Sequence, residues 1–128
     1  MKYFNKKVIV DGIKFDSKLE SNRYIFLKDK LKRGEIKDLK LQVKFELLQP
    51  IKAENVRLST WKTNNIRGMA YIADFSYVLS STNKLIVEDT KGYPTPEYKV
   101  KLKFFIHMIS DMDLEFHEIG TATEWLTD

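Results

Sequence analysis

The sequence contains no cysteine, only two histidines and no long hydrophobic run. Without cysteine there is neither a disulfide framework nor a thiolate metal site, and an intracellular setting is favoured. No apolar stretch approaches the roughly 20 residues of a membrane span, and Met1–Lys7 lacks the long apolar segment of a secretory signal. We therefore expect a cytoplasmic protein that does not interact with a membrane.

Several catalytic patterns are also missing. The sequence has no zinc pattern and no Gly-rich phosphate loop, and its Ser, His and Asp residues do not form a recognisable triad. His107 and His117 lack the spacing of metal ligands, so both are interpreted as structural or surface residues. The chemistry must therefore come from other residues.

The length of 128 residues and the net charge of +4 set the broad class. A chain of this length forms one domain with a single core, so residues 1–128 are interpreted as a single domain. The positive charge is small and is only weak evidence for a polyanionic partner.

The hydrophobic pattern predicts a mixed α/β protein. Asp11-Gly12 between Val8–Val10 and Ile13–Phe15 predicts an N-terminal hairpin, and Thr95 followed by Pro96 predicts a helix start. Residues 51–66 lack periodicity and are expected to form a long loop or an irregular hairpin arm. The expected elements are a hairpin over 8–15, a helix over 17–33 ended by Gly34, strands over 36–48, 69–79 and 85–91, a helix over 95–110, a strand over 114–119 and a short turn over 123–126.

Two neighbouring strands carry the most informative residues, Asp74, Asp89 and Lys91. Side chains alternate along a strand, so Asp89 and Lys91 share one face, whereas Glu88 points to the opposite face, where a helix lysine is its expected partner. Two carboxylates and an ammonium at one sheet edge can hold a divalent metal and activate a water. This arrangement favours a metal-dependent nuclease. The alternative for Asp74 is an aspartate at a strand end that faces water.

The helix over 17–33 supplies a fourth group, Glu20. At 100° per residue it lies in the same stripe as Tyr24, Leu27 and Leu31, where an ionised carboxylate is costly unless it is paired or bound to metal. Ser17-Lys18-Leu19-Glu20 also fits the capping box, in which Glu20 bonds back to the Ser17 amide. The two roles are compatible in the first turn of a helix.

The assigned roles follow from this chemistry. Asp74 and Asp89, with the Thr90 backbone carbonyl, are expected to ligate Mg²⁺ or Mn²⁺, and Glu20 to bind a second ion or orient a metal-bound water. Lys91 is expected to position or deprotonate the attacking water, or to offset charge at the phosphate.

Other residues are candidates for binding rather than chemistry. Lys99 and Lys103 flank the apolar face of the helix over 95–110 and are candidate DNA-phosphate contacts; the alternative is a pair of solvated lysines. Trp61 and Trp125 are candidate exposed anchors at an interface, or ordinary packing residues.

These residues resemble the PD-(D/E)xK nuclease superfamily. More closely, Val10–Glu20, Tyr71–Phe75 and Val87–Gly92 resemble a small phage and prophage family, formerly a domain of unknown function and described as Holliday-junction-resolvase-like. The resemblance covers about Tyr3 to Ile109. One departure is Ala73, which stands where the superfamily name has proline.

The resemblance implies a restriction-endonuclease-like αβββαβ core, with a central mixed sheet flanked by helices. It also implies a Mg²⁺-dependent DNA endonuclease that acts on branched DNA such as Holliday junctions, in the bacterial host of a phage or prophage. Two symmetric cuts at a junction imply a homodimer. The alternatives are a nucleic-acid-binding module that has lost turnover and a protein-interaction subunit of a phage replication complex.

Overall fold

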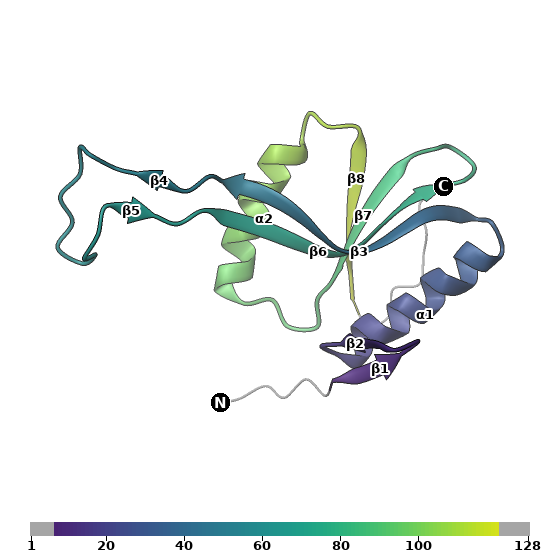
Figure 1. The fold of residues 1–128 in the computed structure, drawn as a ribbon. Helices are drawn as coiled ribbons and strands as arrows, with labels where there is room; N and C mark the ends of the chain where they lie inside the picture. The colour runs from purple at the N-terminus through teal and green to yellow at the C-terminus, as the bar shows by residue number, and fades with distance from the viewer. Residues whose placement is uncertain (1–6, 121–128) are drawn as a thin grey trace. The chain divides into compact units, whose positions relative to one another are not determined.

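The computed structural model describes residues 7–120 (Figure 1). The expected turn over 123–126, with Trp125, lies outside the described residues. Each other expected element is confirmed, and the segment over 51–66 is an irregular hairpin arm with two short strands. The elements are β1 (Val8–Val10), β2 (Ile13–Phe15), α1 (Lys18–Lys32), β3 (Ile36–Leu48), β4 (Ile51–Lys52), β5 (Asn65–Ile66), β6 (Met69–Leu79), β7 (Leu85–Thr90), α2 (Pro96–Ile109) and β8 (Leu114–Ile119).

The central sheet has four strands in the order β3-β6-β7-β8. β6 and β7 are antiparallel, with Phe75 opposite Glu88, whereas β7 and β8 are parallel, with Asp89 opposite Glu118. The sheet is therefore mixed, and the chain is a mixed α/β protein with two helices and an N-terminal hairpin.

Local sequence signals explain the ends of the early elements. Asp11 and Gly12 both have positive φ, 53° and 76°, as a two-residue hairpin turn that matches the strand twist requires. Ser17 caps α1 by accepting a hydrogen bond from the Glu20 N–H at 3.1 Å. Gly34, with φ 76°, follows α1 in the left-handed conformation that commonly ends a helix.

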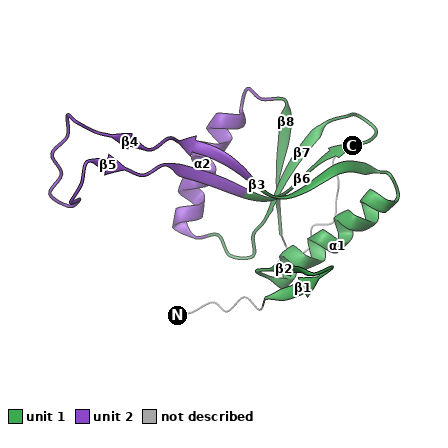
Figure 2. Ribbon diagram, viewed as in Figure 1, with its two compact units in different colours: residues 1–43, 73–94, 113–128 green, residues 44–72, 95–112 purple. Residues whose placement is uncertain are grey.

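The chain divides into two compact units (Figure 2). Unit 1 comprises residues 1–43, 73–94 and 113–128, and unit 2 comprises residues 44–72 and 95–112. In unit 1, α1 and the β1–β2 hairpin share a hydrophobic core with β6 and β7. Its buried members are Phe15, Tyr24, Leu27, Ile36, Phe75, Tyr77, Leu79 and Ile86.

Unit 2 contains a small aromatic cluster. Phe105 of α2 stacks on Tyr71 of β6, with ring centroids 4.3 Å apart, and its ring lies 4.9 Å from that of Phe45 in β3. Thr95 caps α2 by accepting from the Tyr98 N–H at 3.1 Å, as its sequence predicts. Local capping and aromatic packing thus stabilise this helix.

A buried ion pair joins α1 to β7 in unit 1. Arg23 Nε and Nη2 donate to the two carboxylate oxygens of Glu88 at 2.7 and 2.6 Å, and the Tyr77 hydroxyl donates to the same carboxylate. The expectation of a helix lysine as the partner of Glu88 was wrong: the partner is an arginine, whose planar fork matches both carboxylate oxygens. Burial raises the pKa of the Tyr77 hydroxyl, and the charge of Glu88 raises it further.

Candidate active site

Hydrogen bonds connect the segments around Asp74 and Asp89 across the antiparallel pair β6–β7. The Asp74 N–H donates to Asp89 Oδ1 at 3.2 Å, while the Thr90 N–H and hydroxyl donate to Asp74 Oδ2 at 2.9 and 2.7 Å. Asp89 is only 2% exposed and Asp74 is half-buried. These hydrogen bonds fix both side chains in place. Asp74 is therefore not simply an aspartate at a strand end that faces water.

Lys91 follows β7 directly and lies beside Asp89. Its Nζ is 3.5 Å from Asp89 Oδ2, which confirms that the two side chains share a face. The Lys91 N–H donates to the Ile119 carbonyl at 3.0 Å, so β8 holds the backbone at this position. The D-x-K element is thus anchored on both sides of its strand.

Glu20 is buried in the first turn of α1, as its place in the apolar stripe predicts; it is 6% exposed. Burial raises the pKa of Glu20 to about 7, and the negative charge of Asp74 is the next cause, followed by smaller effects of Asp16 and a side-chain hydrogen bond with Asp74. That hydrogen bond means that the two carboxyl groups meet. Burial and the neighbouring charge of Asp74 therefore favour the protonated form of Glu20 below about pH 7.

The capping box is only half formed. Ser17 accepts from the Glu20 N–H, as expected. The backbone hydrogen bond to the Glu20 carboxyl group, which lowers its pKa, involves Asp16 rather than the expected Ser17. Glu20 Oε2 also accepts from Gln42 Nε2 at 3.2 Å. The carboxyl group therefore turns toward Asp74 and Gln42 rather than only back to its own helix.

Gln42 is a site residue that the sequence did not reveal. It is an outward-facing polar residue of β3, like Lys40 and Lys44, and no pattern distinguishes it from them. Its φ of 54° lies in the left-handed region, which is unusual for glutamine inside a strand. Such strain persists where the surrounding structure requires it, often at functional sites.

The donor chemistry of this cluster fits Mg²⁺ or Mn²⁺. Both are bound by carboxylate, carbonyl and water oxygens. Glu20 and Asp74 present two meeting carboxyl groups, and Asp89 lies next to Asp74. Across residues 7–120, however, no three or more acidic or histidine side chains are arranged to enclose a metal ion. The site thus offers a carboxyl pair with a supporting third carboxylate rather than a closed three-carboxylate cage.

Lys99 and Lys103 are exposed on α2, and so is His107. They belong to unit 2, whereas Glu20, Asp74, Asp89 and Lys91 all belong to unit 1. The four predicted catalytic residues are brought together within one unit. A DNA-binding role for the two lysines stays a prediction.

The family was assigned by comparison with known proteins. The sequence profile of a family described as "Protein of unknown function (DUF1064)" matches residues 1–122. The chain belongs to the DUF1064 family. The match includes Glu20, Asp74, Asp89 and Lys91, so the carboxyl cluster lies within this DUF1064 domain. No curated protein matches the chain.

In the described part of this DUF1064 member, residues 7–120, no helix is long and apolar enough to cross a membrane.

Proposed function

We propose that this DUF1064 protein is a Mg²⁺-dependent DNA endonuclease of the PD-(D/E)xK type, with a restriction-endonuclease-like core. The observation that carries the proposal is the convergence in unit 1 of Asp74, Asp89 and Lys91 from adjacent strands with Glu20 from α1. Two carboxyl groups that meet, one buried and one half-buried, are costly as structural elements, which favours a functional role.

The residues of the cluster have three different roles in the proposed reaction. Glu20, Asp74 and Asp89 would hold Mg²⁺ or Mn²⁺, which when bound supplies a Lewis acid for the phosphate and lowers the pKa of a water. Thr90 holds Asp74 through its backbone N–H and its hydroxyl. Lys91, fixed beside Asp89, offsets negative charge at the phosphate undergoing attack.

The substrate we propose is branched DNA, such as a Holliday junction formed during phage recombination or replication in a bacterial host cell. Symmetric cutting of such a junction requires two sites related by a two-fold axis, and hence a homodimer. Lys99 and Lys103, exposed on α2, would contact phosphates without reading bases.

A second candidate is a nucleic-acid-binding module that does not turn over. It is favoured by one observation: within residues 7–120 no three acidic groups enclose a metal position. It predicts DNA binding that depends on salt but no cleavage in any divalent cation.

Cleavage assays separate these two functions. A labelled four-way junction and a linear duplex of the same sequence are incubated with Mg²⁺ or EDTA, using wild type, Asp89→Asn and the control Asp111→Asn. Asp111 is exposed and outside the cluster, whereas asparagine at position 89 keeps an acceptor for the Asp74 N–H. We expect Mg²⁺-dependent cutting of the junction that Asp89→Asn reduces by about two orders of magnitude, with Asp111→Asn unchanged.

The outcomes discriminate clearly. Equal cutting of both substrates retains the nuclease and discards the junction preference. DNA binding without cleavage by wild type, in Mg²⁺ and in Mn²⁺, discards the nuclease and leaves the binding module.

A further inference from the structure

The segment between β3 and β6, residues 49–68, is a separate feature of unit 2, which we name the arm. Figure 1 shows it as an extended hairpin that carries β4 and β5. Ile51 pairs with Ile66 and Lys52 with Asn65, and the Ala53 N–H donates to the Asn64 carbonyl at 2.8 Å. These contacts hold the two sides of the arm together below its loop.

The root of the arm is tightly closed at Gly68. A Cβ at this position would lie 2.8 Å from the Leu48 carbonyl oxygen and 3.1 Å from Pro50 Cδ. Only glycine therefore permits this approach of the two chains. The closed root and the paired strands give the arm a defined local structure.

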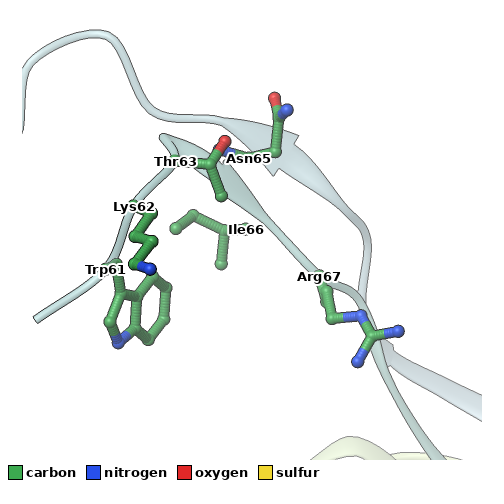
Figure 3. Close-up of a pocket in the computed structure, with 6 residues that line it drawn as sticks. All are labelled: Trp61, Lys62, Thr63, Asn65, Ile66 and Arg67. Carbon is green, nitrogen blue, oxygen red and sulfur yellow. The ribbon is translucent and has the colours of Figure 1, made fainter.

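One face of the arm holds a pocket of about 380 Å³. It is lined by Trp61, Lys62, Thr63, Asn65, Ile66 and Arg67. Figure 3 shows Trp61 and Lys62 at one end, Arg67 at the other and Ile66 between them. The volume falls at the lower end of the range for small-ligand pockets, which suits a single planar group.

The arm is cationic as well as apolar. It carries Lys52, Arg57, Lys62 and Arg67 against one acidic residue, Glu54. Among the ion pairs of residues 7–120, none involves these four cations. Their charge is therefore not neutralised within the described part of the chain and is available to an anionic partner.

Large apolar side chains are exposed beside these charges. Trp61 is 52% exposed, and Ile51, Val56 and Leu58 are also exposed on the arm. Single exposed apolar residues are ordinary, but several of them on one short arm, with a tryptophan at a pocket, mark an interaction surface. A flat indole next to unpaired cations combines the two contacts that single-stranded nucleic acid uses, base stacking and phosphate binding.

We propose that the arm binds single-stranded DNA, with an unpaired base stacked on Trp61 and the flanking phosphates on Lys62 and Arg67. In duplex DNA the base faces are covered by their neighbours, so a stacking pocket selects unpaired bases. A second copy of the arm is disfavoured as the occupant because each copy carries the same excess of positive charge. The inference rests on the proposed function in one respect, since it identifies unpaired DNA as part of the substrate of that nuclease.

Binding is measured in EDTA, so that cleavage plays no part in the result. The chain has two tryptophans, and Trp125→Phe leaves Trp61 as the only indole. An oligothymidylate of about 12 nucleotides, within the range that one single-strand site covers, is titrated against this variant. We expect it to quench the Trp61 fluorescence, and a duplex of equal length to quench it much less.

Two sets of variants test the contacts. Because variants at position 61 lack the indole signal, their affinity is measured by the fluorescence anisotropy of a dye-labelled oligothymidylate. Trp61→Ala should weaken oligothymidylate binding about tenfold or more, whereas Trp61→Phe should retain most of the affinity. Neutralising Lys62 and Arg67 together to glutamine should flatten the slope of log affinity against log salt by about 1.4, at about 0.7 per phosphate contact. The control neutralises Lys14 and Lys37, exposed in unit 1, and should leave the slope unchanged.

Other outcomes overturn the proposal. Equal quenching by duplex, or equal affinity of Trp61→Ala, would refute base stacking. Quenching by phosphatidylserine vesicles but not by oligothymidylate would assign the arm to an anionic membrane surface. Self-association in sedimentation that Trp61→Ala abolishes, without DNA binding, would assign it to a second copy. By contrast, oligothymidylate binding by a wild type that cleaves no DNA in Mg²⁺ or Mn²⁺ would support the arm's role and refute only the nuclease proposal.

Discussion

Replacing Glu20 by glutamine should stabilise the protein at alkaline pH, although glutamine cannot act as the carboxylate we assign to catalysis. Glu20 is 6% exposed and meets the carboxyl group of Asp74. Ionising it in the folded chain therefore forces a buried negative charge next to a second acid. Glutamine keeps the size and an oxygen that can accept from Gln42 Nε2, and it removes that charge.

The size of the expected change in unfolding free energy follows from the pKa of Glu20. Burial, with Asp74, raises the pKa of Glu20 from 4.5 to about 7. The folded state thus favours the protonated acid, and the stability contributed by Glu20 is complete below pH 4.5 and is lost as the pH rises through about 7. Each pKa unit corresponds to about 1.4 kcal/mol, so at pH 8 the loss is up to about 3 kcal/mol.

The assay is urea unfolding of the wild type and Glu20→Gln at several values between pH 4.5 and pH 8, in EDTA. The difference in unfolding free energy between the two proteins should grow in favour of Glu20→Gln by about 1–3 kcal/mol across this range. The control, Glu46→Gln, removes an exposed carboxylate from β3 and should follow the wild-type curve. Mg²⁺ added at pH 8 should stabilise the wild type by mass action and Glu20→Gln much less.

Parallel curves for wild type and Glu20→Gln from pH 4.5 to pH 8 would refute this reasoning. They would mean that Glu20 ionises in the folded chain as readily as in the unfolded one. The carboxyl pair would then lose its significance as a preformed cation site.

Three further perturbations test other parts of the structure. Glu88→Gln leaves Arg23 buried without its carboxylate and should lower the unfolding free energy in urea by about 3 kcal/mol or more; a loss no larger than that of the exposed-pair control Glu35→Gln would contradict the buried-pair argument. Gln42→Gly should be about 1 kcal/mol more stable than Gln42→Ala, because only glycine relieves the positive φ of 54°; an alanine variant as stable as the glycine variant would show that the strain is small. Thr95→Ala should cost about 1 kcal/mol by removing the cap of α2, and thermal unfolding without a lowered midpoint would argue against the cap.

The parts of the fold that were predictable from sequence are those with local causes. Asp11-Gly12 encodes a hairpin turn, and Ser17, Gly34 and Thr95 mark helix ends through contacts within a few residues. The proximity of Asp89 and Lys91 follows from strand alternation alone. Such features need no knowledge of how distant segments pack.

Contacts between distant segments were not predictable in the same way. Arg23 and Glu88 are 65 positions apart, and several helix cations could have served as the partner of Glu88. Gln42 contacts Glu20 from a strand position where the backbone is left-handed, and nothing in the local pattern indicates either feature. Both contacts depend on tertiary packing, which overrides local preference.

The parallel pairing of β7 with β8 has a consequence for protein synthesis. Asp89 lies opposite Glu118, and the Lys91 N–H is bonded to the Ile119 carbonyl, so the strand that carries the D-x-K element needs residues translated well after it. During translation, Glu20, Asp74 and Asp89 leave the ribosome before β8 exists, and β7 is then an unpaired edge. For the nuclease we propose, we therefore expect cleavage competence to be acquired only after β8 has emerged.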